Sequence, residues 1–138
     1  MYLGLELQSV CLYILASYRK YDIKSSEAGV KYFIIGALSS GILLYGLSII
    51  YAFTNSTDFY EISKSINLSL QNNENFLIIN IGFVLILCGL FFKIAVVPFH
   101  MWAPDVYEGS PTSITAFFTT IPKIGVIAFL IKFLNTTF

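Results

Sequence analysis

Two lysines and one glutamate lie inside apolar runs of this sequence, where charged side chains are rare. If residues 76–107 and 111–134 each cross a membrane, Lys93 and Lys123 fall near the middle of the bilayer. A central lysine costs about 2.5–3.5 kcal/mol on insertion scales, so such residues usually face a protein interior or water and mark ion or proton paths. Glu6 lies nearer the end of its run and is equally well explained as an interfacial carboxylate. A buried lysine whose carboxylate partner moves can bind and release a proton near neutral pH.

A break in the third apolar run adds a second candidate feature. Pro98 and Pro104 cannot both belong to one unbroken helix, because each removes a backbone donor and clashes with the preceding turn. Unpaired backbone groups at membrane depth are tolerated only beside protein or water, and broken helices mark the binding sites of transporters. His100 follows the break and could relay protons. The alternative for His100 is a histidine packed against Trp102 or bonded to a freed carbonyl.

The composition that surrounds these residues is that of an integral membrane protein. Of 138 residues, 57% are apolar and 12% are charged, about half the charged fraction of a soluble domain. Eight basic and eight acidic residues cancel, so nothing predicts binding to nucleic acid. There is no glycine-rich phosphate loop, no CxxC and no histidine pair. We therefore expect no cofactor or metal on this chain, and we expect any redox chemistry to lie on another one.

We predict an all-α fold with four membrane crossings in a single domain. A crossing needs about 20 mostly apolar residues, and the predicted crossings are residues 1–18, 28–53, 76–107 and 111–134. The third consists of two half-helices broken near Pro98. The polar linker 54–75 carries Phe59, Ile62, Ile66 and Leu70 at near-helical spacing, which is compatible with a short helix on the membrane interface.

Local signals set the expected helix ends, the packing and the orientation. Ser25 or Ser26 is the expected N-cap of the second crossing, and Ser110-Pro111 the expected start of the fourth. Small residues spaced four apart within 36–41 predict a close approach of another helix. Basic residues concentrate in and beside the first loop, which places that loop on the negative, matrix- or cytosol-like side: Arg19, Lys20, Lys24 and Lys31.

The region around the break resembles a known family. Residues 93–112 have the sequence KIAVVPFHMWAPDVYEGSPT, and this segment resembles subunit 2 of mitochondrial NADH dehydrogenase, respiratory complex I. Shorter stretches agree in order and spacing with the same family: ELQS at 6–9, EAGVKYF at 27–33, GALSSG at 36–41 and IPKI at 121–124. The resemblance covers nearly the whole chain.

The resemblance implies a fold, roles and partners. The family is an antiporter-like membrane subunit built on two inverted repeats, and this chain looks like its fifth to eighth helices. Glu6 then matches a glutamate paired across a moving gap with Lys93 on the broken helix, Lys123 matches a lysine on the central proton path, and His100 matches a histidine next to the break. The implied location is the mitochondrial inner membrane, among lipids and other membrane-arm subunits. NADH, flavin, iron–sulfur clusters and ubiquinone would be bound by other subunits.

A further expectation concerns the helices that precede and follow this segment in the family. We expect them on a separate polypeptide, as in a split gene product, because a reduced subunit that no longer pumps would gain nothing from keeping Lys93 and Lys123 buried. Two alternative functions remain open. One is a component of a related cation/proton antiporter, and the other is a structural or assembly subunit without pumping.

Overall fold

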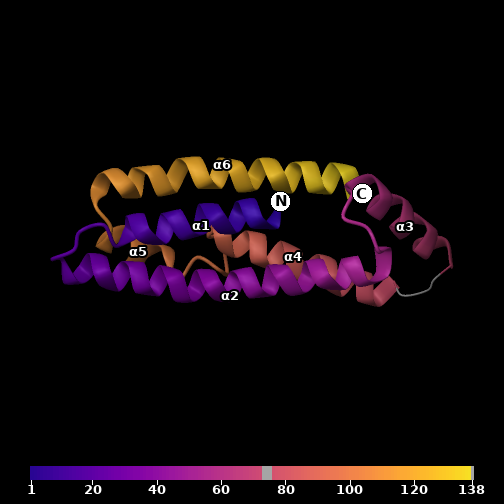
Figure 1. Ribbon diagram of the computed structural model, residues 1–138, viewed down its shortest axis with the longest axis horizontal. Coiled ribbons are helices and arrows are strands. Elements are labelled where there is room, and N and C mark those ends of the chain that lie inside the picture. Colours follow the sequence, from indigo (N-terminus) through magenta and orange to yellow (C-terminus); the bar gives the residue numbers. More distant parts are fainter. Residues whose placement is uncertain (73–75, 138) are drawn as a thin grey trace.

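The fold is an elongated bundle of α-helices, seen in a computed structural model that describes residues 1–72 and 76–137 (Figure 1). In that part of the chain α2 and α6 run along the long axis on opposite sides, with α1 and α5 between them, α4 alongside α2 and α3 at one end. The helices are α1 (Tyr2–Ala16), α2 (Ile23–Thr54), α3 (Phe59–Asn72), α4 (Phe76–Ile94), α5 (Ala103–Gly109) and α6 (Thr112–Thr137). The prediction of an all-α fold is confirmed.

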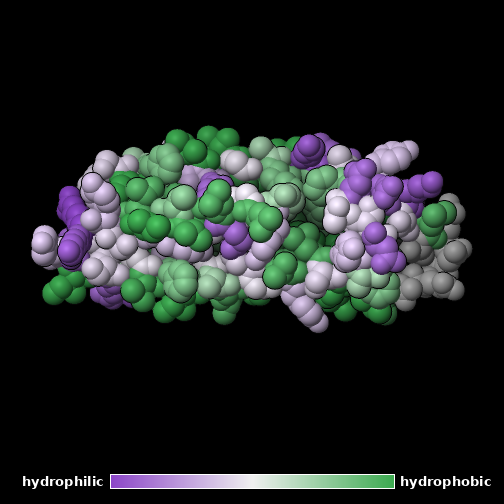
Figure 2. Space-filling model, in the orientation of Figure 1, coloured by the Kyte–Doolittle hydropathy of each residue, from purple (hydrophilic) through white to green (hydrophobic). Residues whose placement is uncertain are grey.

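Three of these helices are long and apolar enough to cross a membrane: Ile23–Thr54, Leu77–Ile94 and Thr112–Thr136. α1 is apolar but has only 15 residues, so the first of the four predicted crossings stays a prediction. Large apolar side chains point outward along the bundle, and on the face in Figure 2 they dominate the middle while polar residues gather at both ends. This distribution matches a bilayer that surrounds the middle of the bundle.

The start of α2 differs from the prediction. The helix begins at Ile23, and Asp22 caps it by accepting a hydrogen bond from the Lys24 backbone N–H at 3.0 Å. The prediction of Ser25 or Ser26 as the N-cap was therefore wrong, because an acceptor stands earlier in the chain and the residues after it are already helical. Ser25 is instead fully buried, and its hydroxyl donates to the carbonyl of Ala16 at 2.8 Å. This bond ties the start of α2 to the end of α1.

The break after α4 includes Pro98, as predicted, but it begins before that proline and continues to the start of α5. Helix α4 ends at Ile94, Ala95 has a left-handed φ of 63°, and helical structure resumes only at Ala103. Pro104 lies in the first turn of α5, where proline is tolerated. The indole N–H of Trp102 donates to the carbonyl of Phe92 at 3.2 Å, which satisfies one of the last carbonyls of α4.

Replacing Trp102 by phenylalanine tests the importance of that bond. Trp102→Phe keeps an aromatic ring but leaves the part-buried Phe92 carbonyl with the Ala95 backbone N–H as its remaining donor, so we expect a loss of about 1 kcal/mol in the free energy of unfolding. Equilibrium unfolding in lipid bicelles measures the change. The neighbouring Met101 is 79% exposed, so Met101→Leu serves as the control and should leave stability unchanged. An unchanged Trp102→Phe variant would show that the bond does not stabilise the break.

The start of α6 lies one residue later than predicted. The helix begins at Thr112, so Pro111 stands just outside it, and the Thr115 backbone N–H bonds the Pro111 carbonyl at 2.9 Å. Ser110 closes α5 instead of capping α6, because its hydroxyl donates to the Val106 carbonyl at 2.7 Å. A short α5 thus ends only two residues before α6 begins.

The linker contains the helix that its spacing indicates. In α3, Ile62 and Ile66 are buried in the larger hydrophobic core, and Phe59 contacts the rings of Phe129 and Phe133 on α6. The apolar face of this helix therefore packs on the end of the bundle. Residues 73–75 of the predicted linker lie outside the described residues.

Glycines allow α2 and α4 to pack closely. A Cβ added at Gly46 of α2 would come within 2.8 Å of the Gly82 carbonyl oxygen of α4, and one added at Gly89 within 2.6 Å of Leu43 Cβ. Of the predicted small-residue pairs, Gly36 packs directly under the Tyr13 ring of α1, whereas Gly41 has nothing within 4 Å in the part of the chain that is described. α1 and α4 therefore pack closely on two different faces of α2, and both carry residues of the candidate functional site.

Candidate functional site

A buried ion pair joins α1 to α4. The Lys93 ammonium lies 2.8 Å from Oε1 of Glu6, and both side chains are largely withdrawn from the surface, with 11% of Lys93 and 25% of Glu6 exposed. Glu6 lies in the second turn of α1, and Lys93 lies in the last turn of α4, directly before the break. Glu6 and Lys93 are 87 residues apart in sequence, and the packing of α1 and α4 on α2 and α6 brings them together.

A third side chain completes the contact. The hydroxyl of Ser40 on α2 donates to the same Oε1 of Glu6 at 2.7 Å, and Ser40 is only 6% exposed. In the sequence alone, Ser40 is prominent only as a small residue that allows close packing. The available signal was its position one turn after Gly36, on a face that must meet another helix, where a hydroxyl has to find an acceptor.

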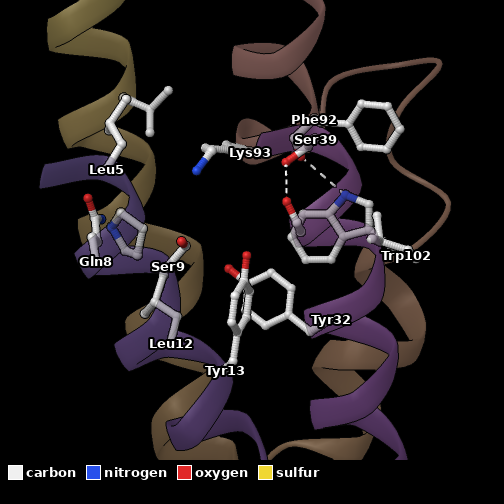
Figure 3. Close-up of a pocket in the computed structure, with 14 residues that line it drawn as sticks. Leu5, Gln8, Ser9, Leu12, Tyr13, Tyr32, Ser39, Phe92, Lys93 and Trp102 are labelled. Atoms are coloured by element: carbon white, nitrogen blue, oxygen red, sulfur yellow. Dashed lines mark hydrogen bonds between the residues drawn. The ribbon is translucent and has the colours of Figure 1, made fainter. Parts of the chain in front are cut away.

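A small cavity of about 30 Å³ adjoins Lys93. This volume holds one or two water molecules if polar groups are available to bind them. In Figure 3 the Lys93 side chain reaches from α4 toward α1, with Gln8, Ser9 and Tyr13 of α1 facing Ser39 and Tyr32 of α2. The remaining wall is mostly apolar: Leu5, Leu12, Ile35, Gly36, Phe92, Trp102, Pro122 and Val126. Among the described residues, Lys93 is the one charged residue that lines this cavity.

Aromatic rings line one side of the cavity, and their contacts connect the break after α4 to the neighbouring helices. Tyr32 stacks on Trp102 with ring centroids 5.0 Å apart, and Tyr13 meets Tyr32 edge-on at 4.8 Å. Trp102 in turn contacts Tyr107 of α5 at 6.1 Å. Because these rings come from α1, α2, the break and α5, they fix the segment after Lys93 against the helices that hold its partners.

Lys123 lies apart from the ion pair. It is partly buried on α6, and its ammonium sits 5.6 Å from the ring centroid of Tyr107, a cation–π contact. The preceding residue, Pro122, lies inside α6 and lines the cavity beside Lys93. A proline within a helix cannot donate to the carbonyl four residues earlier, here that of Phe118, so α6 has a weakened hydrogen-bond ladder next to Lys123.

His100 does not join the pair. It lies in the break with an exposed side chain and is not among the residues that line the cavity, and its backbone carbonyl accepts a bond from Ala103 at 3.0 Å. Of the four residues singled out in the sequence, the structure thus places Glu6 and Lys93 in contact and leaves Lys123 and His100 separate. The role of each in proton transfer stays a prediction.

A second group of charges lies at the surface. Lys31 of α2 contacts Glu27 one turn earlier at 2.8 Å and Asp105 of α5 at 3.4 Å, and all three side chains are about half exposed. Exposed pairs of this kind contribute at most about 1 kcal/mol. They help to hold α5 on α2 but, unlike the Glu6–Lys93 pair, are solvated.

Three membrane-length apolar helices, a break directly after one of them and a largely buried ion pair beside that break define a multi-pass helical membrane protein with a charged interior. Residues 1–137 match the family model for the NADH:quinone oxidoreductase/Mrp antiporter transmembrane domain. The chain belongs to this family.

Curated relatives and solved structures agree with this assignment. The chain is 55% identical over 132 residues to NADH-quinone oxidoreductase subunit N of Bartonella bacilliformis, which covers 96% of this chain and 26% of the relative. It is 53% identical to subunit N of Pelagibacter ubique, covering 99% of this chain and 28% of that one. The chain therefore spans about a quarter of the length of these curated relatives.

The fold also matches a chain of respiratory complex I from Thermus thermophilus, with a TM-score of 0.70, 34% identity and coverage of 94% of this chain and 27% of that chain. A chain of the archaeal membrane-bound sulfane sulfur reductase matches with a TM-score of 0.78 and 27% identity, over 92% of this chain and 25% of that chain.

Proposed function

We propose that this chain is a segment of the antiporter-like membrane subunit of a proton-translocating NADH:quinone oxidoreductase. In this proposal Glu6, Lys93, Lys123 and His100 carry protons, and quinone reduction on other subunits drives the transfer. The observation that supports it most directly is the buried Glu6–Lys93 pair next to a helix break. The names of the bacterial relatives point to the same complex.

The physical basis of the proposal is that a carboxylate partner changes how strongly a buried lysine holds its proton. A lysine next to a carboxylate keeps its proton, whereas one left alone in apolar surroundings releases it more readily. Lys93 sits on the last turn of α4, and the left-handed residue two positions later allows the chain direction to change there. Opening and closing the contact with Glu6 therefore couples a small movement to proton binding, and the neighbouring cavity can supply water for the transfer.

The finer assignment rests on the sequence resemblance of residues 93–112 to subunit 2 of mitochondrial complex I. In this proposal the chain corresponds to the fifth to eighth helices of that subunit, lies in the mitochondrial inner membrane and contacts other membrane-arm subunits. NADH, flavin, iron–sulfur clusters and ubiquinone belong to other subunits. That a separate polypeptide supplies the remaining helices stays a prediction.

A related cation/proton antiporter is the second candidate, because the matching family includes Mrp antiporters. Isolation of the native membrane complex that contains this chain, followed by mass spectrometry of all its polypeptides, separates the two. Flavin and iron–sulfur subunits in the complex support the oxidoreductase. An assembly of membrane subunits that exchanges cations for protons without redox subunits would support the antiporter instead. A second apolar polypeptide with the remaining helices would establish a split subunit.

Neutralising Glu6 tests the pair directly. Glu6→Gln keeps the size of the side chain but removes the carboxylate that pairs with Lys93, so the opening and closing of this ion pair that the proposed transfer needs is lost. We expect proton pumping by the assembled complex to fall by about tenfold, an added barrier of about 1.4 kcal/mol. Acidification measured in sealed vesicles, normalised to assembled complex, gives the result.

The control for this variant is Glu27→Gln, which removes one partner of an exposed ion pair on α2 and should leave pumping unchanged. Normal pumping in Glu6→Gln would contradict the proposed role of the pair. An equal loss in both variants would attribute the effect to general damage.

A further inference from the structure

Glu6 has two donors on one oxygen. Ser40 and Lys93 both donate to Oε1, at 2.7 Å and 2.8 Å. A carboxylate oxygen has room for two donors, so the hydrogen bond from Ser40 does not depend on the presence of the lysine. If the lysine leaves, the carboxylate keeps a hydrogen bond within the protein.

The two donors are anchored very differently. Ser40 has a short side chain near the middle of α2, a continuous helix of 32 residues, and is almost fully buried. Lys93 has a flexible four-carbon stem, and it is the second-last residue of α4 before the break. The geometry therefore makes serine the fixed donor and lysine the movable one.

The cavity beside Lys93 gives the ammonium an alternative position. Its polar lining includes Gln8, Tyr13 and Ser39, all with oxygens able to accept from a lysine. Figure 3 shows these residues on the α1 and α2 walls around the space that the Lys93 side chain enters. The hydroxyl proton of Ser39 is already given to the Gly36 carbonyl at 2.9 Å, so the Ser39 oxygen is oriented as an acceptor.

We propose that Ser40 is a positioning residue that holds the Glu6 carboxylate in place while Lys93 leaves and rejoins the pair. The inference rests on the proposed function, because it assigns the fixed and the moving member of the same ion pair. Without the hydroxyl of Ser40, the Glu6 carboxylate would rotate away from α2 or move together with the Lys93 ammonium. The distance between Glu6 and Lys93 would then no longer change in a defined way.

The experiment uses the complete oxidoreductase in native membranes. Ser40→Ala and Ser40→Cys remove the strong donor, the latter with almost no change in size, and Ser40→Thr retains the hydroxyl. Ser48→Ala is the matched control, because Ser48 lies on α2 but is exposed and bonds its own helix at the Tyr45 carbonyl. The rate of vesicle acidification, normalised to assembled complex, is measured for each variant, and for Ser40→Ala in a Glu6→Gln background.

We expect Ser40→Ala and Ser40→Cys to lower pumping about tenfold at normal amounts of assembled complex, in line with the loss of one hydrogen bond to a charged group. Ser40→Thr should restore pumping, Ser48→Ala should have no effect, and Ser40→Ala should add nothing once Glu6 is neutral. A merely structural serine would give additive losses with Glu6→Gln, which would overturn the inference.

The remaining outcomes separate the two proposals. If Glu6→Gln abolishes pumping but Ser40→Ala and Ser40→Cys pump normally, the role of Ser40 is refuted and the proposed function stands. If Glu6→Gln itself pumps normally, both are refuted. If Ser40→Ala does not assemble, Ser40→Cys decides, and normal pumping by that variant overturns the inference.

Discussion

Lys93→Ala and Lys123→Ala should each lower proton pumping by about tenfold or more in an otherwise assembled complex, an added barrier of at least about 1.4 kcal/mol. Each change removes a partly buried ammonium from within an apolar helix. Such a group is retained at a cost of about 2.5–3.5 kcal/mol, so its removal should not harm insertion. Quinone reductase activity should fall together with pumping, because the two are coupled in the proposed function. Vesicle acidification and quinone reduction, each normalised to assembled complex, measure the effect.

Lys93→Arg makes this test sharper. Arginine preserves the positive charge and pairs well with a carboxylate, but it does not release its proton in proteins. The variant should therefore keep the ion pair with Glu6, assemble normally and still fail to pump. A structural role for Lys93 makes the opposite prediction, because arginine would serve equally well as an ionic contact.

Lys132→Ala supplies the matched control. Lys132 lies on α6 nine residues after Lys123, but its side chain is exposed near the helix end. The complex with Lys132→Ala should pump normally. Normal rates of vesicle acidification and quinone reduction in Lys93→Ala and Lys123→Ala would refute the proton-path assignment and favour the structural alternative. Loss of assembled complex in all three variants would trace the effect to folding.

The charged residues of the site were predictable because their burial is visible in the sequence. Lys93 and Lys123 interrupt long apolar runs, and a charge within such a run is costly to insert and is therefore usually functional. Glu6 was ambiguous from position alone, and it became a candidate partner of Lys93 only through the family resemblance. The structure brings Glu6 and Lys93 to 2.8 Å, which depends on how α1 and α4 pack on α2. No local pattern encodes a contact over that sequence separation.

Ser40 and the cavity could not be predicted in the same way. A serine among small residues in an apolar helix is as consistent with close packing as with a polar contact, and only the partner helix decides between them. The helix ends show the same limit at shorter range. Asp22 and Ser25 are both residue types that cap helices well, and only the structure shows that Asp22 caps α2 while the Ser25 hydroxyl donates to the Ala16 carbonyl of the neighbouring helix.

The position of the break was predictable, but its length was not. Prolines mark where a helix cannot continue, and Pro98 lies within the non-helical stretch between Ile94 and Ala103. The helix ends before the proline, however, at a left-handed Ala95. The Trp102–Phe92 bond and the stacking of Trp102 on Tyr32 stabilise this early end, and both are tertiary contacts.

Gly46→Ala should lower the free energy of unfolding more than Trp102→Phe does. The added Cβ would lie 2.8 Å from the Gly82 carbonyl oxygen and 2.9 Å from the Ile86 backbone nitrogen, both on α4. Backbone atoms cannot rotate out of the way, so α2 and α4 must separate, and overpacking of this kind costs about 1–3 kcal/mol. Since α4 carries Lys93 and α2 carries Ser40, the separation should also loosen the site.

Gly41→Ala is the matched control for this change. It makes the same substitution on the same helix five residues earlier, but the added Cβ meets nothing within 4 Å in the described part of the chain. Alanine is a better helix former than glycine by about 1 kcal/mol, so the chain should be unaffected or slightly stabilised. Equilibrium unfolding of both variants in lipid bicelles and the amount of assembled complex in membranes provide the comparison. Equal stability of Gly46→Ala and the unchanged chain would contradict the close α2–α4 contact. A loss confined to complex assembly in Gly41→Ala would instead place another helix of the complex against this open face of α2.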